Sequence, residues 1–399
     1  MSRDEFKLNA KNLNFGRNAL IVGLVGLISL VAGFFLTPRD NFFFAYLVGY
    51  VFWLSIALGG LFFTMLHHIT GAEWSVVLRR IAESLAMTIP LMGILFIPIA
   101  FGIHDLYHWS HAEQVAKDEL LQHKSGWLNI TFFLIRAIVY FGLWSYLALT
   151  LNRHSLKQDA GDETVLRKMR KLSAPGIIFF ALSITFAAFD FLMSLDPHWY
   201  STIFGVYFFA GSWWLTLAFL NLFSQYLRKN SALGKAMTTE HYHDIGKLMF
   251  GFTVFWAYIA FSQFMLIWYG NIPEETIFYK HRWEYGWEYV SMLLFFGHFV
   301  LPFFILIFRS SKRNLYVMAI MGFWFVFMQW VDYYWLIMPN VTIANPDAHH
   351  GLHFSWLHLS STAGIGGLFL WFFWYRLTSN PIVPIRDPKL ENSMQFVNH

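Results

Sequence analysis

Two aspartates within apolar segments are the side chains of this sequence best placed to do chemistry. Asp190 is followed seven residues later by Pro197, and Asp332 is followed seven residues later by Pro339. An ionisable group in a lipid-embedded helix is costly and usually functional, for example in moving protons. The shared spacing predicts that both carboxylates lie about two turns before the end of a membrane-spanning helix. It also indicates a duplicated architecture.

Arg136 and His298 are two further polar side chains deep in apolar segments. Arg136 lies about nine residues into its segment, which is roughly 13 Å at 1.5 Å per residue. An arginine at this depth needs a carboxylate, carbonyl groups or water, so we expect an ion pair with one of the aspartates. His298 lies near the middle of its segment. It is interpreted either as a neutral residue that hydrogen-bonds between helices or as a proton relay, since histidine titrates near neutral pH.

Glu83 lies at the start of another apolar segment, close to Arg79 and Arg80. Spacings of three and four residues bring side chains together on a helix, so one interpretation is an ion pair at the membrane surface, with the long side chains reaching toward water. The alternative is a proton entrance from the cytoplasm.

Polar side chains also gather at the level of Asp332. Gln329 precedes it by three residues, and Ser262 and Gln263 lie at a similar depth in another segment. Such groups predict a hydrated cavity that opens outward, which would suit a proton exit or a pocket for a quinone head group. In this hypothesis Asp190→Asn leaves assembly intact and lowers turnover. The residues expected on one proton path are Asp190, Asp332, Arg136, His298, Gln263 and Glu83.

Composition places these residues in a membrane protein. The chain of 399 residues is 57% hydrophobic, 20% aromatic and only 13% charged, whereas soluble domains carry about 25% charged residues. Cysteine is absent, which excludes disulfides, iron–sulfur ligation and covalent attachment of a c-type haem. Lipids are the expected surroundings, and no nucleic-acid partner is expected. The first apolar segment is too long for a signal peptide, so no cleaved leader is expected.

Ten stretches are long and apolar enough to cross a membrane, which takes about 20 residues each. They predict an all-α, polytopic integral membrane protein with a single membrane domain over 1–399. The expected spans are 19–36, 42–66, 81–102, 128–151, 174–194, 201–227, 247–269, 286–308, 314–337 and 356–378.

Lysine and arginine residues set the expected orientation. Of the 28, 22 lie on the N-terminal side of the membrane, five lie on the opposite side, and Arg136 lies within a span. Positive charge accumulates on the cytoplasmic side, so both termini are predicted to be cytoplasmic. The external side carries several carboxylates and ten histidines, among them His104, His198 and His358. It is either a solvated, weakly acidic surface or a docking face for extracytoplasmic subunits.

Short sequence echoes support a duplication with an offset of four spans. Span two leaves the membrane through LHHITG (66–71), span six is followed by HYHDIG (241–246), and spans four and eight both begin Gly-Trp. An even offset preserves helix direction, which predicts a parallel repeat about an axis along the membrane normal. The expected units are a four-helix bundle of spans 2–5 (42–194) and a second of spans 6–9 (201–337), with spans 1 and 10 peripheral.

Haem is not expected in this chain. A haem held between helices needs two facing histidines at matching depth. His298 is the only deep histidine, and His67 and His68 lie at the end of a span. The chain alone should therefore show no haem absorption in the visible range.

Three long motifs resemble those of a known family. HHITGAEWSVVLRR (67–80), FDFLMSLDPHWYSTIFGVY (189–207) and DIGKLMFGFTVFWAYIAFSQFMLIWYGNIPEET (244–276) are similar to the F subunit of bacterial alternative complex III. That complex is a quinol:cytochrome c, or other high-potential acceptor, oxidoreductase. Its membrane subunits belong with those of polysulfide and nitrite reductases. The resemblance covers about residues 15–378.

The resemblance implies a non-redox membrane subunit that carries no cofactor of its own. Haem and iron–sulfur clusters would belong to partners, namely a multihaem cytochrome c, an iron–sulfur protein and a C-type membrane subunit. In such complexes the better-attested quinol pocket is in the C subunit, and the F subunit is its structural counterpart and a candidate to house proton half-channels. Menaquinone or another quinone is a candidate ligand of this chain. The implied location is the bacterial cytoplasmic (inner) membrane.

A stand-alone secondary transporter is the alternative hypothesis, with the intramembrane aspartates, arginine and histidine as its machinery. Repeat transporters usually have helices broken by glycine or proline at corresponding places in both halves. Pro90 and Pro98 interrupt span three, but span seven has no proline before Pro273, past its end. This difference disfavours the transporter.

Overall fold

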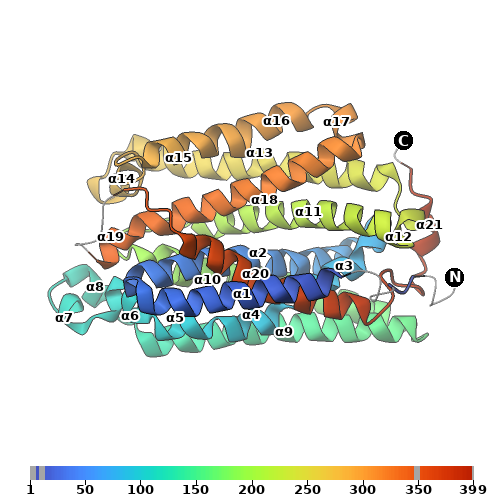
Figure 1. The fold of residues 1–399 in the computed structure, drawn as a ribbon, viewed down its shortest axis with the longest axis horizontal. Coiled ribbons are helices and arrows are strands. Elements are labelled where there is room, and N and C mark those ends of the chain that lie inside the picture. The colour runs from blue at the N-terminus through green and yellow to red at the C-terminus, as the bar shows by residue number, and fades with distance from the viewer. Residues whose placement is uncertain (1–5, 9–13, 346–350, 398–399) are drawn as a thin grey trace.

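The protein is a bundle of long helices that run in both directions along one axis (Figure 1). The computed structural model describes residues 6–8, 14–345 and 351–397. Over these residues the chain forms helices and loops without a strand, and nine helical segments are long and apolar enough to cross a membrane. The prediction of an all-α, polytopic membrane protein is thus confirmed. Arg3, Lys11, His349 and His350, which entered the charge and histidine patterns, lie outside the described residues.

Eight helices are long and continuous, and each contains most of one expected span. Three of them extend about two turns beyond the apolar stretch, at the end where lysine and arginine are concentrated, because polar residues continue a helix outside lipid. The eight are α1 (Phe15–Leu36), α2 (Arg39–Thr70), α9 (Ile130–Asp159), α10 (Val165–Phe191), α11 (Phe204–Asn230), α13 (Thr239–Gly270), α18 (Leu315–Ile337) and α20 (Trp356–Thr378).

The third expected span is broken into three pieces. Pro90 and Pro98 lie in the first turns of the second and third pieces, where the missing N–H of proline has no partner to lose. The pieces are α3 (Val76–Ala86), α4 (Ile89–Leu95) and α5 (Ile97–Phe101).

The eighth expected span contains a π-helix. Leu294–Val300, labelled η4, separates α15 (Trp287–Leu293) from α16 (Leu301–Leu306). A π-helix carries an extra residue per turn and is frequently found at functional sites. The extra residue rotates every following side chain about the helix axis.

Short helices close the two ends of the bundle. The described N-terminal residues, α12, α17 and α21 lie at one end, and α6–α8, α14 and α19 lie at the other (Figure 1). Their bounds are α6 (Ile103–Leu106), α7 (Ala112–Val115), α8 (Glu119–Lys124), α12 (Leu233–Ala236), α14 (Pro273–Lys280), α17 (Arg309–Arg313), α19 (Val341–Ala344) and α21 (Leu390–Met394), with 3-10 turns at His108–Ser110, Met193–Leu195 and Met338–Asn340.

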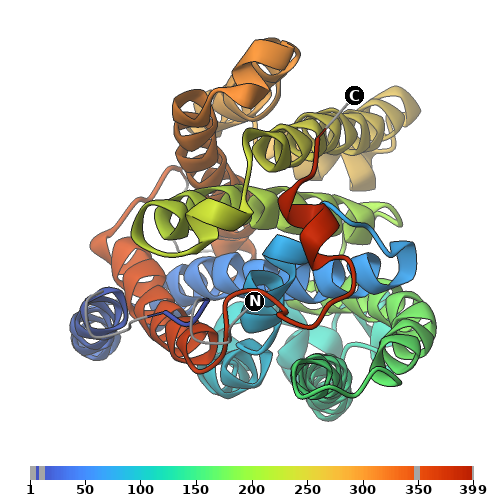
Figure 2. The same cartoon turned by 90° about the vertical axis from the view of Figure 1, so that its right-hand side faces the viewer.

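Helix α2 is the centre of the bundle. It is apolar on all sides and buried over almost its whole length, as expected for a helix surrounded by others. It contacts α3, α10 and α9 on one side, α11 and α18 on another, and α20. Figure 2, which looks along the bundle, shows α2 between a lower group that includes α9 and α10 and an upper group that includes α11 and α13.

Helices α1 and α20 pack against each other through glycines. A Cβ atom added at Gly26 would lie 2.4 Å from the backbone nitrogen of Gly364, and one added at Gly367 would lie 2.2 Å from that of Gly23. Small residues let membrane helices approach closely, where packing replaces the hydrophobic effect as the source of affinity. This contact attaches α1, which is otherwise exposed, to the bundle.

Gly26→Leu is expected to lower the stability of the folded protein. The side chain has no space against α20, and overpacking costs about 1–3 kcal/mol. Thermal unfolding in detergent measures the effect. Gly142→Leu on α9 is the matched control, because a Cβ there meets no described atom within 4 Å. An unchanged unfolding temperature for Gly26→Leu would contradict the glycine contact.

Candidate functional site

Asp190 is held in a two-point ion pair with Arg136. Arg136 Nε donates to Asp190 Oδ2 at 2.8 Å, and Nη2 donates to Oδ1 at 2.8 Å. The Tyr140 hydroxyl donates to Oδ2 at 2.7 Å, and Trp127 Nε1 donates to Oδ1 at 3.1 Å. Asp190 and Arg136 are both buried. The expected ion pair between Arg136 and one aspartate is therefore confirmed.

The Asp190 carboxylate accepts a full set of hydrogen bonds. Four donor groups from α9 and the residues before it bind its two oxygens. The Arg136 guanidinium carbon also lies over the rings of Trp127 and Phe132, at 4.2 and 4.4 Å from their centroids. Arg136 Nη1 donates to the Trp127 carbonyl at 2.9 Å. A buried pair of this kind is costly to break, because the remaining partner is left charged and unpaired. Asp190 is thus a structural clamp between α9 and α10.

Asp332 has a different environment, with neutral partners. The Tyr207 hydroxyl donates to Asp332 Oδ1 at 2.5 Å, and Gln329 Nε2 donates to Oδ2 at 2.9 Å. Asp332 is fully buried. No ion pair formed by the described residues includes it. When it binds a proton, charge leaves the membrane interior and no ion pair is broken.

His298 extends this hydrogen-bonded chain toward the middle of the bundle. Its Nε2 lies 3.2 Å from Gln329 Oε1. Since the Gln329 amide nitrogen faces Asp332, the amide oxygen accepts from His298, which places the histidine proton on Nε2. The chain therefore runs His298, Gln329, Asp332, Tyr207 across η4, α18 and α11.

His298 is also stacked between two indole rings. Its ring centroid lies 4.0 Å from that of Trp214 and 3.7 Å from that of Trp256, with interplanar angles of 16° and 24°. Trp324 Nε1 donates to the carbonyl of Gly297, within the same π-helix, at 2.7 Å. The π-helix thus places His298 between the tryptophans while a side chain satisfies one of its backbone carbonyls.

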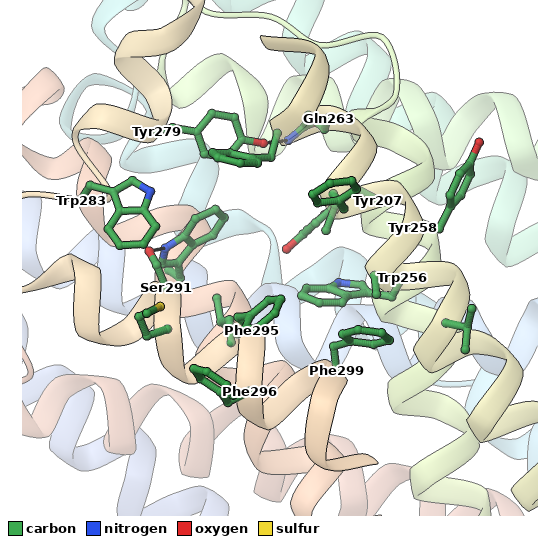
Figure 3. A pocket seen from close by; sticks show the side chains of 18 residues that line it. Tyr207, Trp256, Tyr258, Gln263, Tyr279, Trp283, Ser291, Phe295, Phe296 and Phe299 are labelled. Carbon is green, nitrogen blue, oxygen red and sulfur yellow. Dashed lines mark hydrogen bonds between the residues drawn. The ribbon is translucent and has the colours of Figure 1, made fainter. Parts of the chain in front are cut away.

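A cavity of about 640 Å³ adjoins this chain. Figure 3 shows Tyr207 extending from α11 toward the middle of the lining side chains, with Trp256 below it and Gln263 and Tyr279 above. The lining is largely aromatic and comes mainly from α13, the end of α14 and its following loop, α15 and η4. Asp332 and Gln329 do not line it, although Tyr207, which does, donates to Asp332. The largely aromatic lining of this cavity was not expected, although Gln263 contributes to it, and the hydrated cavity stays a prediction.

Gln263 lies on the cavity wall and not on the hydrogen-bonded chain. Its Nε2 donates to the Tyr279 hydroxyl at 3.1 Å, and its Oε1 accepts from Ser201 at 2.9 Å. Tyr279 lies in α14, outside the spans, and burial raises its pKa. Gln263 therefore fixes a neutral hydroxyl at the outer edge of the cavity.

Arg282 caps the C-terminal end of α18, the helix that carries Asp332. The guanidinium donates to the carbonyls of Trp335 and Leu336 at 3.3 and 3.0 Å, and to that of Phe278 at 2.9 Å. It is fully buried, and its burial lowers the pKa of Arg282 to about 9. A cation at the C-terminal carbonyls of α18 is favoured by the helix dipole. Arg282 is one of the five basic residues that the charge pattern assigns to the outer side, and a lone positive charge in the sequence gives no sign of burial.

Glu83 forms the expected ion pairs, but it does not lie at a solvated surface. Its carboxylate lies 3.1 Å from Arg79 Nε and 3.2 Å from Arg80 Nη1. Arg79 also contacts Asp387 at 2.5 Å, and Arg80 contacts Asp159 at 2.6 Å. All five side chains are buried. The interpretation as an interfacial pair reaching toward water is wrong, because the C-terminal segment folds back over the cluster.

The outer histidines do not form one surface. His358 is buried and lies within the first turn of α20, where its Nδ1 accepts from the Ser355 backbone nitrogen at 3.1 Å. His198 is exposed and pairs with Asp118 at 2.6 Å, a hydrogen bond that lowers the pKa of Asp118. Across the part of the chain that the structure describes, no group of three or more His, Asp or Glu side chains could hold a metal ion.

The six residues expected on one path fall into separate groups. Asp332 and His298 are linked through Gln329, while Asp190 and Arg136 form a clamp of their own. Gln263 lines the cavity, and the Glu83 cluster belongs to the opposite end of the bundle, beside α21. Sequence analysis missed Tyr140, although it lies four residues after Arg136 on the same helical face and could have been found. It also missed Tyr207, which stands in a motif already singled out.

Comparison with known proteins gives no family: no family model matches the chain, and no curated protein matches it.

Arg136→Leu is expected to lower the free energy of unfolding by about 3–5 kcal/mol, because Asp190 would remain buried without its cation. Denaturation in detergent measures this loss. The double variant Arg136→Leu with Asp190→Leu should recover part of it, since no unpaired charge remains. A double variant no more stable than Arg136→Leu alone would contradict the clamp.

Proposed function

We propose that this chain is the F-type membrane subunit of a respiratory complex that oxidises quinol and reduces cytochrome c or another high-potential acceptor. In this proposal the chain is a non-redox subunit that supports quinol oxidation and carries protons through the membrane. The resemblance of three motifs to the F subunit of alternative complex III supplies the class of complex. The hydrogen-bonded chain through Asp332 supplies the proton chemistry.

The observation that carries the proposal is the contrast between the two aspartates. Asp190 is neutralised by Arg136 and saturated with donors. Asp332 is equally buried, and the side chains that donate to it among the described residues, such as Tyr207 and Gln329, are neutral. A structural carboxylate in lipid is normally paired, so a buried one held by neutral donors is costly unless it exchanges protons. We therefore propose that the proton path runs through spans 6–9, the second group of helices, and that Asp190 stabilises the fold.

The finer architecture belongs to the same proposal. Helix α20 is proposed as a tenth span, because its 23 residues pack along α1 and α2. Spans 2–5 and 6–9 are proposed as two related four-helix bundles, with spans 1 and 10 peripheral. Contacts of α9 with α10 and of α11 with α13 and α18 support this grouping. The C-terminal ends of α10 and α18, which carry the aspartates, support the repeat.

The proposed setting is the bacterial cytoplasmic membrane, with both termini in the cytoplasm. Multihaem cytochrome c, iron–sulfur and C-type membrane subunits are the proposed partners, and they would hold the haem and the clusters. The exposed His198–Asp118 pair and the neighbouring loops would then face the extracytoplasmic partners.

The transporter alternative receives less support. Helix α13, which corresponds to the broken third span under the four-span offset, is continuous from Thr239 to Gly270. A transporter built from matched broken helices needs an interruption there. The irregular segment of the second group is η4, in the next span.

Asp332→Asn in the intact complex should lower quinol:acceptor turnover by about 100-fold, as for the loss of a general base, or should lower the number of protons released per quinol. Activity and proton release are measured together in liposomes. Tyr50→Phe is the matched control, because Tyr50 is equally buried and its hydroxyl donates to the Met92 carbonyl at 2.9 Å, outside the Asp332 chain. Full turnover and proton yield in Asp332→Asn would exclude the proposed role.

The orientation can be tested directly, because the chain contains no cysteine. Glu113→Cys, in α7, should react with an impermeant thiol reagent in intact cells. Lys168→Cys, at the exposed start of α10, should react only after the cells are opened. Both positions are solvent-exposed, so accessibility within the fold does not distinguish them. The reverse labelling pattern would rule out cytoplasmic termini.

A further inference from the structure

We infer that the aromatic cavity beside Tyr207 is a binding site for a membrane-soluble quinone or quinol ring. This inference rests on the proposed function for the class of ligand, and it deepens that function by naming a site within this chain. It concerns binding only and requires no electron transfer by the chain.

The size and position of the cavity suit a ring delivered from the lipid. Its volume of about 640 Å³ lies within the range of about 300–1,000 Å³ that is usual for small-molecule sites. Several lining side chains are exposed on the outer face of the bundle, among them Tyr258 at 64% and Phe261 at 59%. In a membrane-spanning protein such a face meets lipid or a partner subunit. A hydrophobic ligand can therefore enter sideways between α13 and α15.

The lining chemistry favours a flat, neutral ring. Trp256, Phe295 and Phe299 are among the aromatic side chains around the space (Figure 3), and aromatic rings bind other rings by stacking and edge contacts. No Lys, Arg, Asp or Glu occurs among the described residues that line it. A phosphate head group would find no cation there, so an anionic lipid head is not the ligand that the wall recognises.

Two hydroxyl groups on the cavity wall, those of Tyr207 and Tyr279, are available to bind ring oxygens. The hydroxyl of Tyr207 donates to Asp332, which leaves its oxygen free to accept a hydrogen bond from a ligand hydroxyl. At the outer edge, the Tyr279 hydroxyl accepts from Gln263 and keeps its own proton to donate to a ligand carbonyl. An acyl chain would use neither group, whereas a ring with two oxygens would use both.

The cavity also shares a wall with the proton-binding chain. Trp256 lines the cavity with one part of its ring and stacks on His298 with a face. Four cavity residues belong to the π-helix that carries His298, namely Leu294, Phe295, Phe296 and Phe299. The distortion that positions His298 therefore also shapes the cavity, which ties ligand binding to the Asp332 network.

Photolabelling of the full-length chain in lipid nanodiscs tests the inference. The probe is a photoreactive azidonaphthoquinone, and labelled peptides are identified by mass spectrometry. Peptides from α13 and from α15–η4 should carry the label, and menaquinone-4 should displace it. Phytol, which has a similar chain but no ring, should not. Equal displacement by phytol would mean that the cavity holds only lipid chains, and labelling elsewhere would also overturn the inference.

A cavity-filling variant gives the second arm. Ala260→Trp places a ring in the cavity and should reduce labelling by about tenfold, because the new ring occupies space that the probe needs. Leu266→Trp, on the same helix, is the matched control, since Leu266 is 66% exposed and does not line the cavity. Unchanged labelling in a folded Ala260→Trp would overturn the site. If that variant does not fold, the displacement experiment on the natural sequence still decides the question.

The two proposals fail separately. Labelling is measured on the isolated chain, so it does not require the respiratory complex. Loss of turnover in Asp332→Asn concerns proton transfer and does not require a ring in this cavity. A labelled cavity in a chain whose Asp332→Asn complex keeps full activity would retain the site and remove the proton role.

Discussion

The structure depends on one constraint: a charge that is buried in a membrane protein must be compensated by another group of the same protein. Arg136 is compensated by Asp190, and Arg282 by the carbonyls at the end of α18. In the Glu83 cluster, the charges of two arginines are compensated by those of three carboxylates. Each of these contacts joins different elements. The buried charges therefore also decide which helices pack together, because apolar helix surfaces in lipid favour no particular partner.

Asp332 is the departure from this pattern, and its surroundings explain how it is tolerated. Arg282 secures the helix end about one turn beyond it without reaching the carboxyl itself. Tyr207 and Gln329 supply donors that suit the carboxylate, and both are fixed by packing in the buried interior. Arg282 thus fixes the end of α18, whereas Tyr207 and Gln329 fix the side chain of Asp332. The position is thus well ordered without an ion pair.

The sequence indicated the class of fold and part of the site for physical reasons. Long apolar stretches can only be helices in lipid, so the spans were predictable. A single deep arginine had to find a carboxylate, although its choice of Asp190 over Asp332 depended on how the helices pack. The burial of Glu83 could not be predicted, because it results from a polar C-terminal segment that returns to the bundle through Asp387. No sequence signal marked the π-helix around His298, which is stabilised by contacts such as that of Trp324 with a freed carbonyl.

The π-helix explains why the two groups of helices differ despite their echoes in sequence. In the first group, α9 is continuous, and Arg136 and Tyr140 lie one turn apart on a single face toward Asp190. In the second group, η4 rotates the side chains that follow it, and His298 is linked to the Asp332 carboxyl through Gln329 and not by direct contact. The second group thus has a neutral hydrogen-bonded chain where the first has an ion pair, and aromatic side chains surround a cavity beside that chain. A regular helix with a paired arginine therefore provides a clamp, and an irregular helix with a stacked histidine provides a site that has room for a ligand.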